Sequence, residues 1–172
     1  MSTPAVAVLI RGSAADAAVT VRAVRANTDY APRAVYLVLD GPPAEALNQA
    51  AAVRGEPVLA FLDAGLAPAR SDWLTRMVAR LTPMAVGAVV GTLAPAVGTL
   101  AGLVVRHDTF DLLGGFDADR HPDAGFIEDF LARLIGLGSE CVAADGVEFL
   151  AGSSQLFRGM GTARGVLANS FQ

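Results

Sequence analysis

The sequence has few of the residues that cross-link small proteins or hold zinc in them. Cys141 is the only cysteine among 172 residues, and the two histidines, His107 and His121, are distant from it in the chain. A disulfide framework is therefore excluded within the chain, and a zinc site of cysteine and histidine would have too few ligands. A lone thiol is typical of a reducing compartment, so we expect a cytoplasmic protein.

Lysine is missing altogether, and the basic residues form no run. The 13 basic residues are all arginine, and 17 acidic residues outnumber them, which leaves a formal net charge of -4. Binding to nucleic acid or to an anionic membrane surface relies on clustered positive charge. We therefore expect neither as a partner.

Charge is also absent from the stretch between Leu81 and Val105, which is long enough to span a bilayer. Pro83 and Pro95 interrupt this stretch, and most of its other residues are small or β-branched. Such a composition favours two buried strands joined by a turn around Pro95 over a membrane span. The apolar run near the amino terminus ends at Arg11, so it indicates a first strand instead of a signal peptide.

Hydrophobic residues make up 53% of the sequence and charged residues 17%, which is enough for a sizeable core. Short apolar runs without polar alternation indicate strands that are covered on both faces, as in α/β proteins. We expect one domain over residues 1–155 and a C-terminal tail over 156–172. The predicted strands are 5–10, 35–39, 58–62, 141–143 and 147–150, besides the uncharged pair, and the predicted helices are 14–25, 43–53, 73–81, 107–113 and 126–136.

Two aspartates follow predicted parallel strands directly. Asp40 comes after the second strand and Asp63 after the third. The carboxyl ends of parallel strands are where α/β sheets bind ligands, so both are candidate site residues. The alternative for Asp40 is an ordinary turn, because aspartate and glycine are common turn residues.

A second acidic pair, Glu128 and Asp129, begins the predicted helix 126–136. A carboxylate at such a place is suited to accept a proton from an attacking hydroxyl group. The alternative is structural, because acidic residues in a first helical turn are favoured by the helix dipole.

Four stretches resemble, in sequence and in order, the family 2 glycosyltransferases of the GT-A type. They are Leu37-Val38-Leu39-Asp40-Gly41, Phe61-Leu62-Asp63-Ala64-Gly65 followed by Trp73-Leu74, Gly114-Gly115-Phe116-Asp117, and Glu128-Asp129 with Arg133 behind. The resemblance implies a single-domain, Rossmann-like, mostly parallel sheet flanked by helices. It also implies inverting transfer of a sugar from a nucleotide sugar to an acceptor that the sequence does not identify.

The resemblance implies roles for five residues. Asp129 would be the catalytic base, with Glu128 beside it, and Asp40, Asp63 and Gly115 would bind the donor.

The sequence departs from the family pattern where the family holds a divalent cation. Gly65 replaces the second acid after the third strand, and Leu150 stands where a late histidine is common. A single carboxylate with water is a weak cation site, so we predict no cofactor and at most weak binding of Mn²⁺ or Mg²⁺ through Asp63. In the loop of Asp40, Leu39 and Pro42 replace an acid and a serine.

Two functional hypotheses therefore stay open. The chain is either an active glycosyltransferase or an inactive pseudo-glycosyltransferase that serves as a binding, assembly or regulatory module. The short connection expected around Pro95 leaves little room for an acceptor loop. A second copy of the chain or a partner transferase is therefore expected to complete the site.

Overall fold

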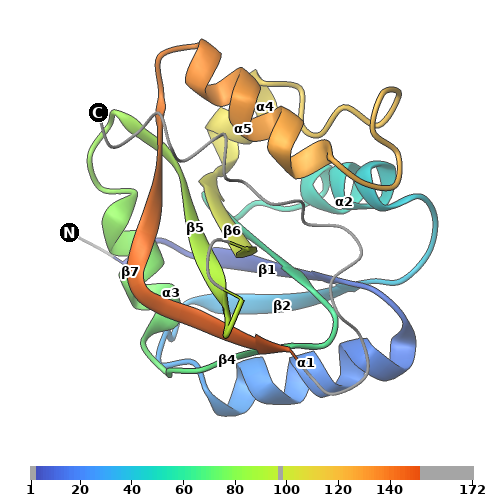
Figure 1. Ribbon diagram of the computed structural model, residues 1–172, viewed down its shortest axis with the longest axis vertical. Coiled ribbons are helices and arrows are strands. Elements are labelled where there is room, and N and C mark those ends of the chain that lie inside the picture. Colours follow the sequence, from blue (N-terminus) through green and yellow to red (C-terminus); the bar gives the residue numbers. More distant parts are fainter. Residues whose placement is uncertain (1–2, 97–98, 152–172) are drawn as a thin grey trace.

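The computed structural model describes residues 3–96 and 99–151, and the predicted tail at 156–172 lies outside them. These residues form one seven-stranded sheet with helices on both faces (Figure 1). The strands are β1 (Val6–Arg11), β2 (Arg33–Val38), β3 (Val58–Asp63), β4 (Leu66–Pro68), β5 (Val86–Ala94), β6 (Leu100–Arg106) and β7 (Glu140–Ala151). The helices are α1 (Ala14–Ala26), α2 (Pro43–Ala52), α3 (Trp73–Arg80), α4 (His107–Leu112) and α5 (Phe126–Gly136).

The first three strands are parallel, as predicted, with β1 between β2 and β3. Helix α1 begins after Ser13, whose hydroxyl oxygen accepts a hydrogen bond from the Asp16 amide at 3.3 Å. Proline at the first position of α2 has its φ angle fixed near the helical value, so Pro43 suits the start of that helix. These βα units bring the carboxyl ends of the three strands to one edge of the sheet.

The uncharged stretch forms an antiparallel strand pair, β5 and β6, as predicted. Val89 and Val104 lie opposite each other in this pair, and both are fully buried. No helix within residues 3–96 and 99–151 is long and apolar enough to cross a membrane.

The strand order is β2-β1-β3-β6-β5-β7-β4, and the sheet is more mixed than the first three strands suggest. Strand β3 pairs antiparallel with β6, and β4 pairs antiparallel with β7, whereas β5 and β7 are parallel. The two late strands predicted separately are one long strand, β7.

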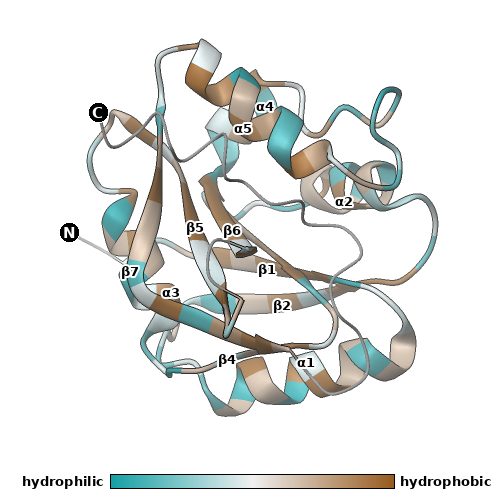
Figure 2. Ribbon diagram, in the orientation of Figure 1, coloured by the Kyte–Doolittle hydropathy of each residue, from teal (hydrophilic) through white to brown (hydrophobic). Residues whose placement is uncertain are grey.

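Two hydrophobic cores fill the space between the sheet and its helices, and the strands appear mainly brown in Figure 2. Alternate residues of β1 point into different cores, Leu9 into one and Val8 into the other. The core under α2, α4 and α5 is rich in phenylalanine, and Phe116 packs edge-on against Phe61 with 5.1 Å between ring centroids. These contacts fix the α4–α5 loop to the sheet.

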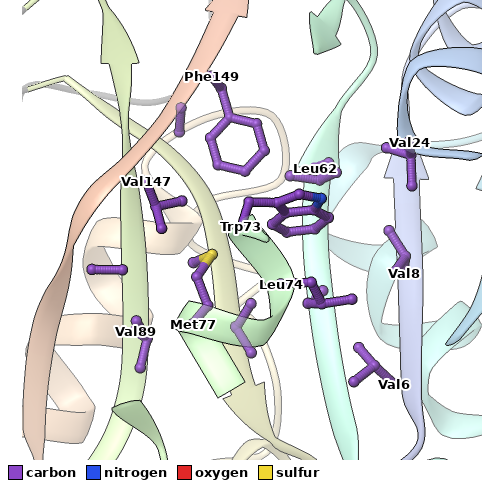
Figure 3. Close-up of a cluster of buried hydrophobic side chains, with 14 of the residues drawn as sticks. Val6, Val8, Val24, Leu62, Trp73, Leu74, Met77, Val89, Val147 and Phe149 are labelled. Carbon is purple, nitrogen blue, oxygen red and sulfur yellow. The ribbon is translucent and has the colours of Figure 1, made fainter. Parts of the chain in front are cut away.

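The other core lies under α1 and α3. Trp73 is its largest side chain, and Figure 3 shows it between Leu62, Met77 and Phe149. The indole is fully buried, and its Nε1 donates to Thr28 Oγ1 at 2.9 Å.

Candidate functional site

Three residues end the parallel strands side by side. Arg11 at the end of β1 is in register with Val38 of β2 and with Asp63 of β3. Asp40 lies two residues after β2 and is exposed. Both predicted donor-binding aspartates are therefore at the same edge of the sheet.

The Asp63 carboxylate is occupied by an internal partner. Arg11 donates from Nε to Asp63 Oδ1 at 3.2 Å, and the Asp63 side chain is only 19% exposed. Burial raises the pKa of Asp63, and the nearby Arg11 guanidinium opposes that rise. The sequence predicted Asp63 as a site residue but gave no sign of this ion pair.

The backbone after Asp63 is fastened to two neighbouring elements. The Gly65 amide donates to Oγ1 of Thr20, a fully buried residue of α1, at 2.8 Å. Ala64 approaches β1 so closely that a Cβ at Gly12 would lie 2.4 Å from the Ala64 Cβ, so only glycine fits at position 12. The loop that would carry the family's metal ligands is therefore held in one conformation by its contacts.

A divalent cation does not fit the residues present at this edge. Gly65 has no side-chain oxygen, and its φ of +93° opposes replacement by aspartate. Leu150 lies on β7 opposite Ala67 and is 49% exposed, but its side chain has no ligand atom. Within the part of the chain that the structure describes, no three His, Cys, Asp or Glu residues are grouped to hold a metal ion.

Helix α5 carries the second acidic pair in its first turn. The Asp129 carboxylate accepts from Arg133 Nε at 2.7 Å, and His121 Nε2 lies 3.9 Å from its other oxygen. Arg133 also donates to the carbonyl oxygens of Leu113 and Gly115, at 2.7 and 2.8 Å. Arg133 thus joins Asp129 to the turn at Gly114 and Gly115, the glycine turn.

Glu128 differs from its neighbour because one of its oxygens has no partner. Its Oε2 is buried and accepts no hydrogen bond from any described residue. A buried carboxylate oxygen without a donor is costly, and such atoms are often partnered by a ligand or a water.

Asn48 of α2 holds the glycine turn from the other side and was missed by the sequence analysis. Its Nδ2 donates to the Phe116 carbonyl oxygen at 2.8 Å, and its Oδ1 accepts from the Phe116 amide at 2.9 Å. Gly115 has a φ of +72°, and a Cβ there would lie 2.6 Å from Asn48 Oδ1. A polar residue on a partly apolar helix gives no sequence signal for this role.

The α4–α5 loop also contacts the start of α2, beside which it runs in Figure 1. The Ala44 amide donates to the Pro122 carbonyl oxygen at 3.1 Å. An open hollow of about 380 Å³ lies over the glycine turn, with Asn48, Asp117 and Arg133 in its wall. The first turn of α2, which directly follows the loop with Asp40, is therefore in contact with the loop before Glu128.

A larger and more apolar hollow, of about 450 Å³, lies at the opposite edge of the sheet. Its wall includes Val58, the first residue of β3, together with Leu81 and Met84. None of the predicted site residues contributes to it. Size alone therefore does not identify the site.

Solved structures of sugar-transferring enzymes share the fold of this chain. No protein-family model matches the chain, and no curated protein matches it in sequence. A mannosyltransferase from Pyrobaculum calidifontis, solved with GDP-mannose and Mn²⁺, is similar in structure, with a TM-score of 0.75 and 16% identity. The match covers 97% of this chain, and the chain spans 60% of the length of that enzyme.

Two further solved structures are similar. The catalytic domain of Drosophila β1,4-galactosyltransferase 7 has a TM-score of 0.68 at 15% identity, over 91% of this chain and 77% of that one. Glucosyl-3-phosphoglycerate synthase from Mycobacterium tuberculosis, solved with Mn²⁺ and UDP, has a TM-score of 0.61 at 12% identity, over 81% and 68%. The expected architecture is confirmed: the chain has the fold of the GT-A glycosyltransferases.

Proposed function

We propose that the protein is a glycosyltransferase that moves a sugar from a nucleotide sugar to an acceptor hydroxyl with inversion at the anomeric carbon. The observation that carries the proposal is the hydrogen bond of 3.1 Å from the Ala44 amide to the Pro122 carbonyl oxygen. It joins the first turn of α2, which directly follows the loop of Asp40, to the loop that leads to the acids of α5. Candidate partners for donor and acceptor groups therefore lie on neighbouring segments.

In this mechanism Asp129 accepts the proton of the acceptor hydroxyl as its oxygen forms a bond to the anomeric carbon. The bond from that carbon to the diphosphate breaks in the same step, and the nucleoside diphosphate leaves with the electron pair. Arg133 holds the Asp129 carboxylate through its Nε and steadies the neighbouring turn through the Gly115 carbonyl oxygen. Attack from the face opposite the leaving group accounts for the inversion.

We assign Glu128 to acceptor binding beside the base. Its unpartnered buried Oε2 is a hydrogen-bond acceptor that a sugar hydroxyl would satisfy. Asp40 is assigned to the nucleoside, because it is exposed at the carboxyl edge and free to meet a ligand.

A pseudo-glycosyltransferase is the second candidate function, and the state of Asp63 favours it. Its carboxylate is paired with Arg11, and the backbone that follows is bonded to Thr20 through Gly65. A fold kept as a binding or regulatory module would tolerate such changes. In that case a second copy or a partner transferase would be the molecule that it binds.

We also propose that the protein works in the cytoplasm. Cys141 is a free, fully buried thiol, which suits a reducing compartment.

Turnover separates the two candidates. The purified protein is incubated with UDP-sugars and GDP-sugars as donors and with a panel of sugars and small alcohols as acceptors. The release of the nucleoside diphosphate is then measured. We expect turnover that Asp129→Asn abolishes, while Asp123→Asn, an exposed change in the preceding loop, leaves it intact. Wild-type turnover in Asp129→Asn would disprove the base assignment, and no turnover with any pair would favour the pseudo-enzyme.

A further inference from the structure

Arg11 places a positive charge in the middle of the edge formed by the carboxyl ends of β1, β2 and β3, the candidate donor site. It is the last residue of β1, and β1 lies between the two other parallel strands. Val38 and Asp63 stand beside it at the ends of those strands. A ligand at the carboxyl ends of β1 to β3 would therefore meet the guanidinium group.

Most of the hydrogen-bonding capacity of Arg11 is unused. A guanidinium group has five N–H donors, and within the described residues only Nε has a side-chain partner, Asp63. The Arg11 side chain is 24% exposed, so a part of it reaches solvent. The pairing with Asp63 orients the planar group and leaves Nη1 and Nη2 for a ligand.

A nucleoside diphosphate leaving group needs a positive partner, and this edge offers no adequate metal site. Gly65 and Leu150 have no side-chain ligand atoms where the resemblance leads one to expect them. Arginine is suited to the task because its fork of N–H groups matches two phosphate oxygens at once. Helix α1 begins at Ala14, three residues after Arg11, with Ser13 as its N-cap. The amino end of this helix adds partial positive charge.

We propose that Arg11 binds the diphosphate of the nucleotide-sugar donor in place of a divalent cation, and that Asp63 is a positioning residue that holds the guanidinium group. This inference rests on the proposed function, because it assigns a donor of that reaction to this edge. Asp63 offsets one positive charge, so we expect moderate affinity for a diphosphate. The same contact stabilises the charge that grows on the diphosphate as it leaves.

Calorimetry with UDP, GDP and inorganic pyrophosphate, all in EDTA, tests the assignment. We expect Arg11→Ala to weaken diphosphate binding by about tenfold or more, because a charge-assisted pair of hydrogen bonds is lost. Arg22→Ala removes the same charge from an exposed position of α1 and is the matched control, with affinity within about twofold of wild type. Asp63→Asn is expected to weaken binding less than Arg11→Ala.

Arg11→Lys guards against loss of the fold, since it keeps a positive charge beside Asp63. Its thermal unfolding is compared with wild type, and we expect weaker pyrophosphate binding, because lysine has no planar fork. If Arg11→Ala does not fold, the affinity of Arg11→Lys for the same diphosphates is compared with that of wild type instead.

The outcomes separate this inference from the function on which it rests. Wild-type affinity for UDP or GDP in the Arg11 variants would overturn the role of Arg11 and leave the proposed function standing. The titrations are repeated with Mn²⁺ in place of EDTA, and binding that requires Mn²⁺ and is lost in Asp63→Asn would overturn the role of Arg11 too.

Arg11-dependent binding of pyrophosphate without binding of any nucleotide would keep the anion site and reject the transferase. No binding of any diphosphate in either buffer would overturn both.

Discussion

Arg133 and Asp129 form an ion pair one helical turn apart on α5, with 2.7 Å between Nε and Oδ2. The same guanidinium group donates to the Leu113 and Gly115 carbonyl oxygens, so one side chain ties the candidate base to the glycine turn. The geometry of the α4–α5 region therefore depends on Arg133.

Replacing Arg133 by alanine is expected to lower the free energy of unfolding by about 1–3 kcal/mol, because two backbone acceptors and a carboxylate lose their donor. Urea unfolding followed by circular dichroism measures the change. Arg120→Ala is the control, since Arg120 is exposed and its nearest carboxylate oxygen, in Asp117, is 3.7 Å away. Equal stability of the two variants would show that Arg133 does not hold the turn.

Asn48→Ala tests the other support of the same turn. The amide bonds both backbone groups of Phe116, so its loss is expected to lower the free energy of unfolding by about 1–2 kcal/mol. Gln49→Ala is a matched control on the same helix, because Gln49 bonds only the exposed Glu45 side chain. A loss no larger than that of the control would contradict the role assigned to Asn48.

Trp73 is expected to report on the core and not on ligands. It is fully buried, and its ring lies 5.3 Å from that of Phe149 in an edge-to-face arrangement. Trp73→Ala should lower the free energy of unfolding by about 3–5 kcal/mol, as for other large core truncations. Because this is the only tryptophan, the native fluorescence should be blue-shifted and shift to the red on unfolding. Native emission at the wavelength of exposed indole would show that the core is not formed as described.

Cys141 is expected to be inert in the folded protein. Burial raises the pKa of its thiol to about 12, so at pH 8 the reactive thiolate is scarce as well as inaccessible. Iodoacetamide should leave the native protein unmodified at pH 8 and alkylate it fully in urea, as intact mass measures. Rapid alkylation of the native protein would contradict the burial of β7 against β5.

The sequence was most informative where local chemistry and burial agree. Helix α5 has the predicted bounds, and the parallel strands β1 to β3 and the β5–β6 pair lie where the apolar runs predicted them. Strand β4 was missed because it has three residues and ends in a proline. The gap between the two predicted late strands, Ala144-Asp145-Gly146, has the composition of a turn. In the structure these residues continue β7, because the pairing of β7 with β5 shifts register there and Gly146 adopts a φ of +69°.

The candidate site was less predictable because its contacts are tertiary. The sequence identified Asp40, Asp63 and the acids of α5, but their roles stay predictions. Arg11 looked only like the end of an apolar run, since its pairing with Asp63 depends on the alignment of two strands distant in the chain. An aspartate at position 65 would have a strained backbone, because φ at that residue is +93°.

The central claim is that this edge of the sheet binds a nucleotide sugar without a metal ion. The most direct measurement is isothermal calorimetry of the wild-type protein against nucleoside diphosphates and their sugars, once in EDTA and once in Mn²⁺. We predict binding in EDTA, with an affinity that Mn²⁺ does not improve. No heat of binding from any nucleotide in either buffer would contradict the account.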